Sequence, residues 1–274
     1  MLNKLKSNYS EVIFILVFLV LYAISFTIPA DVRPSSLDIV GILYRLLNTI
    51  LPIVFILIFF PTDTRHYSDY KDRNKLILFF INIPLLFLIM MQIIIQVNSN
   101  FTRISVILAS LLAIIIYLSK YNKRRVPLTC RLKGVIFIII TFLLYKLPLV
   151  LLYHTIFTNH YTSIEFVIAI LSTLIFTALT EEVIFRDFLL FGLISRGISP
   201  KSANMIQAII FGLIHIAVNR QARLKIYSGS NLLICSILTC SFQVLIGYLF
   251  GKIVIKSKSI GCSVILHTLI DFIN

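Results

Sequence analysis

Two adjacent carboxylates and an arginine stand within an apolar part of the chain, between the apolar runs 166–179 and 188–194. An ionised side chain inside a bilayer costs roughly 2.5–3.5 kcal/mol or more, so such groups usually face a protein interior or a wet cavity and find partners there. Glu182 and Arg186 are four residues apart and can pair on one face of a helix. Glu181 points about 100° away from Glu182 on that helix and needs another partner.

Two histidines in later apolar segments are candidates to meet Glu181. His215 lies in a short apolar segment four residues after Phe211, so the phenyl ring can pack beside the imidazole. His267 and Asp271 are also four residues apart, in the last apolar segment of the chain. The free-energy cost of placing these polar groups in a membrane is lowest if all three segments direct them into one shared, water-filled cavity. We therefore expect these side chains to converge.

Such a set of side chains could perform hydrolysis. A carboxylate beside a neutral imidazole can hold and deprotonate a water molecule, a general-base effect worth about 10²–10⁴ in rate. A second imidazole with a polar neighbour can donate to a developing oxyanion, which is worth about 2.7–4 kcal/mol per donor. The same residue types could alternatively form a Zn²⁺ shell, although the HExxH spacing is absent. Each group alone could instead be structural, as an ion-pair clamp or an interhelical hydrogen bond.

The composition indicates a polytopic membrane protein. Of its 274 residues, 59% are hydrophobic, with a mean hydropathy of +0.99, whereas soluble domains are about 45–50% apolar. We therefore expect an all-α transmembrane bundle of about eight or nine spans around a polar cavity. The net charge of +14 is typical of basic loops beside anionic lipid head groups, because the cations are scattered between spans. Nucleic-acid binding is not expected.

The apolar segments divide the chain into an N-terminal region of spans, 1–160, and a catalytic core, 161–274. The first segment is interpreted as a retained span, because its apolar run is longer than that of a signal peptide. Pro and polar residues separate the later ones. The expected spans are 12–28, 39–60, 76–97, 104–119, 135–153, 164 into the Glu-Glu stretch, a short segment at 204–218, 232–255 and 260–273.

The distribution of basic residues predicts the orientation. If the N-terminus is cytoplasmic, the loops on that side hold 18 of the 25 Lys and Arg residues, the asymmetry that the positive-inside rule expects. This predicts a multi-pass protein of the cell membrane. The loop after the seventh segment, with Arg220, Arg223 and Lys225, does not fit, so that segment could be re-entrant. The expected cytoplasmic loops are 1–10, 61–75, 120–134, 186–203 and 252–259.

Cysteine and glycine positions give weaker signals. The cysteines have no CxxC spacing and are expected to be free thiols, mostly buried, with no disulfide framework or thiolate metal site. Gly247 and Gly251 match the small-xxx-small pattern that lets membrane helices approach closely. The cysteines are Cys130, Cys235, Cys240 and Cys262.

Together these patterns resemble the three motifs of the CPBP family, which holds the CAAX prenyl proteases and the Abi-type bacterial membrane proteins. The motifs are Glu181-Glu182-x3-Arg186, Phe211-x3-His215 and His267-x3-Asp271. The resemblance covers about residues 165–274 and includes the approach to the last histidine, 259–267. It implies a helical membrane bundle around a cavity open to the cytoplasmic side.

The resemblance also implies a role for each site residue. Glu181 and His215 would activate water, and His267 with position 271 would form the oxyanion site. Glu182 and Arg186 would shape the site. Prenyl-protease members commonly carry Asn where this chain has Asp271, and an ionised carboxylate cannot donate to an oxyanion. Asp271 is therefore either protonated or orients His267 as an acceptor, and we favour the second.

The sequence thus predicts an intramembrane endopeptidase of the glutamate type, acting without a cofactor. The expected substrate is a hydrophobic or lipid-attached peptide, cleaved near the cytoplasmic face. Zn²⁺ dependence is the alternative for the mechanism. A non-catalytic immunity or scaffold protein with the same bundle is the alternative function, and a proton-coupled transporter is a third class.

Overall fold

A computed structural model describes residues 9–25, 39–59, 75–83, 99–119, 122, 125–153, 163–224 and 231–273. Its regular structure is helical throughout these ranges, which confirms the expected all-α bundle. Within these ranges, four helices are long and apolar enough to cross a membrane, and three shorter apolar helices accompany them. The number of spans stays a prediction, as does the division into two regions at residue 161.

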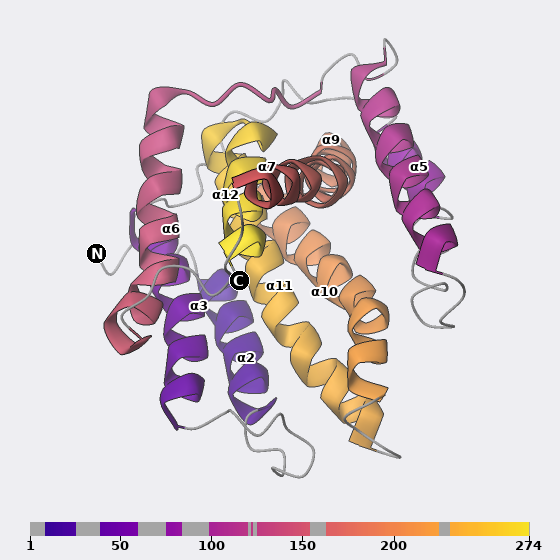
Figure 1. The fold of residues 1–274 in the computed structure, drawn as a ribbon. Helices are drawn as coiled ribbons and strands as arrows, with labels where there is room; N and C mark the ends of the chain where they lie inside the picture. The colour runs from indigo at the N-terminus through magenta and orange to yellow at the C-terminus, as the bar shows by residue number, and fades with distance from the viewer. Residues whose placement is uncertain are drawn as a thin grey trace.

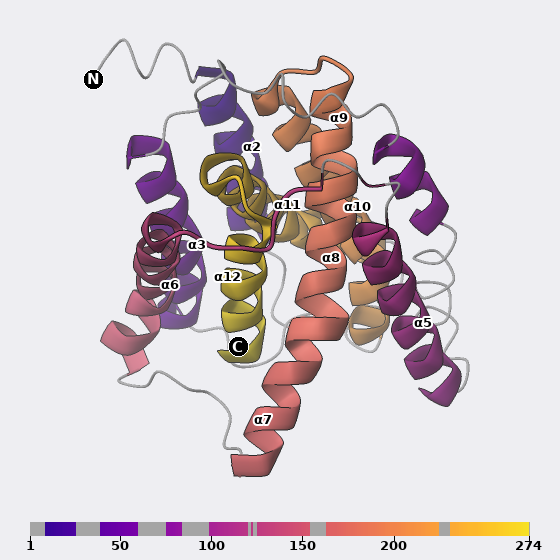
Figure 2. The ribbon, with the colours of Figure 1, turned by 90° about the horizontal axis from the view of Figure 1, so that it is seen from above.

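The helices surround a central pair formed by the last two of them (Figure 1). α11 (Asn231–Ser257) packs most extensively on α10 (Pro200–Leu224) and also against α2 (Tyr9–Ser25). α12 (Ile260–Ile273) lies between α6 (Leu132–Tyr153) and a long helix that begins with α7 (Ser163–Ser172). On the far side of that helix stands α5 (Ser99–Leu118), while α3 (Ile39–Phe59) packs on α6 (Figure 2). A short helical stretch, 75–83, is described as well.

The long helix carries the Glu-Glu stretch and is wider than an α-helix in two places. After α7 it continues as η3 (Thr173–Leu179), α8 (Thr180–Glu182), η4 (Val183–Leu190) and α9 (Phe191–Ser195). Both η segments are π-helical, a rare form that frequently occurs at functional sites. All eight residues of η4 are buried. The expected cytoplasmic loop 186–203 is therefore wrong over its first half, because the apolar run 188–194 extends the helix.

A sharp turn joins this helix to α10. Gly197 has a φ of 90°, and its N–H and that of Ile198 bond the carbonyls of Ile194 and Leu193. This is the Schellman motif, in which glycine best adopts the left-handed position. Ser199 then caps α10, because its Oγ accepts a hydrogen bond from the N–H of Ser202. The turn directs α10 back along the long helix, toward the residues that follow Glu181.

Lys252 and Lys75, which the sequence places in expected cytoplasmic loops, are instead buried among helices. Lys252 of α11 donates to Glu11 of α2 at 2.6 Å, and Tyr248 donates to the same carboxylate at 2.7 Å. Lys75 donates to Asp187 of η4 at 2.8 Å. All of these side chains are buried, because each charge has a partner of opposite sign. Arg220 and Arg223 also lie within a helix, α10, and Lys225 lies outside the described residues.

The structure corrects the expectation for two of the cysteines. Cys130 and Cys262 form a disulfide across a sequence separation of 132 residues. A pairing over that distance leaves no local spacing for a sequence pattern to show. Cys240 is buried and not part of a disulfide, as expected, and the side chain of Cys235 lies outside the described residues.

Gly247 and Gly251 lie where α10 and α11 approach closely. A Cβ at Gly247 would stand 2.9 Å from the Phe211 ring, and one at Gly251 would overlap the Asn204 side chain. Asn204 is held there because its amide donates to the carbonyl of Tyr248 at 3.1 Å. The close approach predicted from the small residues is therefore confirmed.

Replacing Gly251 by alanine should destabilise the protein by about 1–3 kcal/mol, because the added methyl group forces the buried Asn204 from its place. The midpoint of thermal unfolding in detergent measures this. Gln243→Ala, at a half-buried position of the same helix, should have a much smaller effect. Equal midpoints for Gly251→Ala and the unmodified protein would show that the helices can separate without cost.

Candidate active site

Glu182 and Arg186 form the predicted ion pair. Arg186 Nε lies 3.1 Å from Glu182 Oε2, and neither side chain is exposed to solvent. Arg186 also donates from Nη2 to the carbonyl of Gly247 at 3.3 Å, so the pair ties the long helix to α11. Because the π-helical segment begins at Val183, the pair stands at the point where the helix widens.

Aromatic rings enclose the guanidinium of Arg186. Its central carbon lies 4.5 Å from the ring centroid of Phe211, 5.3 Å from that of Phe250 and 5.9 Å from that of Phe185. A cation over aromatic faces is stabilised electrostatically, by about 2 kcal/mol or more when desolvated. Phe211 therefore has a role beyond packing on His215, since it also supports the cation that neutralises Glu182.

His267 lies between two carboxylates. Its Nδ1 is 3.0 Å from Glu182 Oε1, and its Nε2 is 3.2 Å from Asp271 Oδ2. Carboxylate oxygens accept hydrogen bonds, so a ring protonated on both nitrogens satisfies both contacts. Phe250 stacks on the ring with centroids 4.6 Å apart. Glu182 thus fixes the imidazole from one side, and the Asp271 side chain, 38% exposed, contacts it from the more open side.

His215 has a defined tautomer when it is neutral. Its Nδ1 lies 2.7 Å from the backbone carbonyl of Phe211, which can only accept, so Nδ1 carries the proton. The lone pair of Nε2 then faces the Glu181 carboxylate, 4.0 Å away. The Phe211 ring packs on the imidazole at 4.4 Å between centroids, as the four-residue spacing predicts.

Glu181 lies between the two histidines. Its Oε2 is 4.0 Å from His215 Nε2 and 3.8 Å from His267 Nε2. That oxygen is buried and has no hydrogen-bond partner within the described part of the chain. A water placed about 2.8 Å from both Glu181 Oε2 and His215 Nε2 would make an angle of roughly 90° between them, which a hydrogen-bonded water tolerates. The arrangement can therefore hold a water between two proton acceptors.

Several residues that support this site were not singled out by sequence patterns. Phe250 stacks on His267, and Gln207 donates to the same Gly247 carbonyl as Arg186, at 2.8 Å. Asp187 follows Arg186 but faces elsewhere, accepting from Lys75, Asn122 and the N–H of Val126. Asn204, Gln207 and His215 share one face of α10 with Phe211, a spacing that could have shown Gln207 and Asn204.

The side chains do not fit a metal ion as they are placed. Among the described residues, no three His, Cys, Asp or Glu side chains have the mutual geometry to hold one. The proposed chemistry therefore uses the side chains alone, without a step through Zn²⁺.

The class of protein follows from the bundle, the buried polar site and one comparison. Residues 163–273 match the family model described as "Type II CAAX prenyl endopeptidase Rce1-like". The family is one of proteases, and the apolar helices support a membrane protein. The chain therefore carries an Rce1-like CAAX-protease domain, which confirms the resemblance to the CPBP family. Every predicted site residue, from Glu181 to Asp271, lies within the matched range. No curated protein and no solved structure matches the chain.

Proposed function

We propose that this protein is an intramembrane endopeptidase in which Glu181 and His215 activate a water molecule. The observation that supports this most strongly is the buried, unpartnered Oε2 of Glu181, which faces the Nε2 atoms of both histidines. A structural carboxylate would be bonded directly to its neighbours. This one leaves room for a bridging molecule that donates hydrogen bonds to it.

In the proposed reaction, Glu181 takes a proton from the water as the oxygen attacks the carbonyl carbon of the peptide. His215 accepts the second hydrogen of the water at Nε2 and so fixes its orientation. The proton held by Glu181 then passes to the leaving amine. The doubly protonated His267, oriented by Asp271, would stabilise the developing oxyanion from its Nε2–H, which the carboxylate and the oxyanion share. Glu182 and Arg186 hold His267 in place.

The proposed substrate is a hydrophobic or lipid-attached peptide, cleaved near the cytoplasmic face of the cell membrane, with the N-terminus of the protein on that side. The description of the matched family, a CAAX prenyl endopeptidase, supports an isoprenyl group as the lipid. The long helix that carries Glu181 begins with α7, which exposes apolar side chains, among them Ile164, Val167 and Ile168. Such a surface can lie against the lipid of the membrane. A membrane-anchored substrate would reach such a site laterally.

Comparing the peptides of cells tests the function even while the substrate is unidentified. Cells that carry the unmodified protein should contain cleaved peptides that are missing in cells carrying Glu181→Gln, as seen by mass spectrometry. Glu165→Gln is the matched control, because Glu165 is an exposed acid in the first turn of the same long helix. Identical peptides in all three strains would favour the immunity or scaffold alternative.

Asp271→Asn should lower kcat by about tenfold. The Asp271 carboxylate lies 3.2 Å from His267 Nε2, and a charge-assisted bond is worth about 1–1.5 kcal/mol more than the neutral bond to an amide. Steady-state cleavage of a lipidated peptide measures this. An unchanged or higher kcat would instead make position 271 an oxyanion donor, as the asparagine common in prenyl proteases suggests.

A further inference from the structure

Residues 125–131 form a short segment between α5 and α6 that contacts both the long helix and α12. We call this segment the strap. At one end the N–H of Val126 donates to Asp187 Oδ1 at 2.7 Å. At the next residue the carbonyl of Pro127 accepts from the N–H of Ile260 at 3.0 Å. The strap therefore touches η4 directly after Arg186 and then the first residue of α12, so it connects two elements of the proposed site.

The strap continues along α12 and ends in a covalent bond. A Cβ at Gly261 would overlap the carbonyl of Leu128, so only glycine allows this approach. Cys130 is then bonded to Cys262. Gly134 gives the two sulfurs room, since a Cβ there would lie 2.7 Å and 2.9 Å from them. The pair is thus built into the contact between strap and helix.

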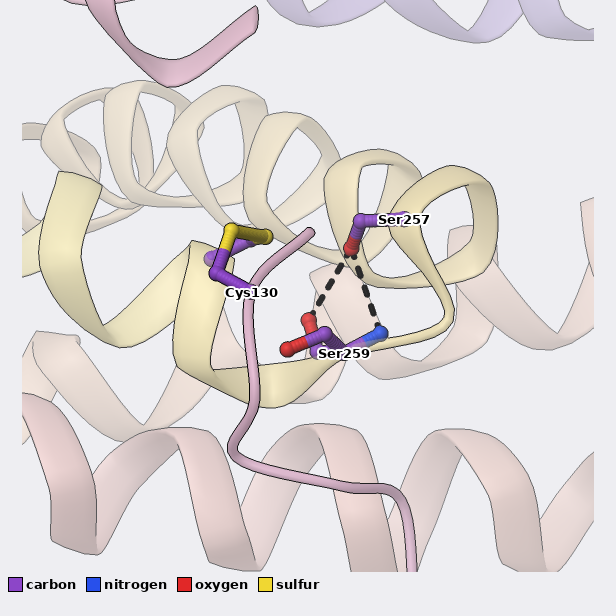
Figure 3. The surroundings of a disulfide bond; sticks show 4 residues. Cys130, Ser257 and Ser259 are labelled. Atoms are coloured by element: carbon purple, nitrogen blue, oxygen red, sulfur yellow. Dashed lines mark hydrogen bonds between the residues drawn. A yellow bond between two sulfur atoms is a disulfide. The ribbon is translucent and has the colours of Figure 1, made fainter. Parts of the chain in front are cut away.

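The turn before α12 is ordered beside the same disulfide (Figure 3). Ser257 Oγ donates to the carbonyl of Ser259 at 3.0 Å and accepts from its N–H at 3.2 Å. Lys258 between them has a φ of 53°. Cys262 precedes His267 by five residues, roughly 7.5 Å along the helix axis. The disulfide at Cys262 therefore restrains the N-terminal end of α12, the helix that carries His267.

The location of the pair argues for a reactive disulfide. The 120–134 segment carries six of the basic residues that predict a cytoplasmic face. Disulfides in the cytosol are rare and are usually transient, catalytic or redox-sensing. Cys130 is half-buried, whereas Cys262 is fully buried. The neighbouring Arg131 and Lys133 are exposed cations that attract an anionic thiolate to Cys130.

We propose that Cys130 and Cys262 are a thiol–disulfide modification site that responds to small cytosolic thiols and controls how firmly α12 is held. A thiolate attacks Cys130 Sγ and forms a mixed disulfide, while Cys262 leaves as a thiolate and takes up a proton. A second thiol then attacks the mixed disulfide and releases Cys130. The two cysteines gain two electrons and two protons, and the two small thiols become one disulfide.

Reduction should loosen the strap without unfolding the bundle. The hydrogen bonds of Val126 and Pro127 remain, but the covalent closure of a long loop is lost. We expect the midpoint of thermal unfolding to fall by roughly 5–15 °C. Amide hydrogen exchange should become at least several-fold faster in α12 and should change much less in α3, which packs mainly on α6.

Thiol trapping in cells tests the proposal, in a variant with Cys235→Ser and Cys240→Ser so that only the pair is counted. Acid-quenched cells are labelled with a maleimide polymer, and the shift in gel mobility reports the fraction of reduced pairs. A membrane-permeant dithiol should reduce the pair within minutes, and the disulfide should return after its removal. A charged, impermeant reductant should leave the pair unchanged.

Each other outcome overturns the proposal. A pair that stays oxidised in the permeant dithiol is structural, and one reduced equally by the impermeant reagent faces the outside. A pair that is never oxidised in cells has no disulfide state to modify. Hydrogen exchange of purified oxidised and reduced protein completes the test, because equal rates in α12 would separate the cysteines from the site. The link between the disulfide and catalysis rests on the proposed function. Neither readout uses activity, so the disulfide proposal and the proposed function can fail independently.

Discussion

Glu181→Gln should lower kcat by about 10²–10⁴ while leaving the protein folded. Its carboxylate lies near both Nε2 atoms, at 4.0 Å from that of His215 and 3.8 Å from that of His267. Glutamine keeps the size of the side chain but cannot take a proton from water, so the general-base contribution is lost. Steady-state cleavage of a lipidated peptide in vesicles measures kcat, and the midpoint of thermal unfolding verifies the fold.

One control variant and one second site variant test whether this loss of kcat is specific to Glu181. Glu165→Gln makes the same chemical change at an exposed position of the same helix and should leave kcat unchanged. His215→Ala should reduce kcat strongly as well, because the proposed water loses its second acceptor. Retention of full activity in Glu181→Gln would mean that another group activates the water. Activity that survives strong chelation in the unmodified protein agrees with a site that acts through side chains.

Arg186→Ala should destabilise the protein by about 3–5 kcal/mol, because it leaves Glu182 as a buried, unpaired charge. The guanidinium is fully buried, 3.1 Å from that carboxylate, and lies over the ring of Phe211 at 4.5 Å. The midpoint of thermal unfolding in detergent should fall by roughly 10 °C. Activity should fall with it, since Glu182 also holds His267 at 3.0 Å.

The double variant Glu182→Gln with Arg186→Met separates charge from shape. Removing both charges should recover part of the stability lost in Arg186→Ala, because no buried charge is left unpaired. Arg131→Ala, which removes an exposed arginine, should change the midpoint of unfolding little. If Arg186→Ala were as stable as Arg131→Ala, the ion pair would not hold the long helix against its neighbours.

The local polar spacing predicted much of the site geometry. Pairs four residues apart, such as Glu182 with Arg186 and His267 with Asp271, meet because a helix places them on one face. The convergence of Glu181 with the two histidines followed from the cost of polar groups in a membrane. What these residues do remains a proposal, which the variants above test.

The features that sequence patterns missed depend on distant parts of the chain. Glu11 and Lys252 are 241 residues apart, and Cys130 and Cys262 are 132 apart, so no local period relates them. Lys252 looked like a loop cation because its partner stands in the first turn of α2. The π-helical widening on both sides of Glu182 has no periodic signal either, although the η4 segment that follows it is fully buried.

The most direct test of the proposed chemistry is one mass-spectrometric measurement of a single turnover in ¹⁸O-labelled water, recording both the peptide product and the intact protein. A water activated by Glu181 attacks the peptide carbonyl directly, so the new terminal carboxylate should carry one ¹⁸O atom and the protein should keep its original mass throughout. The Glu181→Gln variant should yield no product in the same time. An acyl fragment attached to the protein during turnover, or a peptide that stays uncleaved by the unmodified protein, would contradict the account.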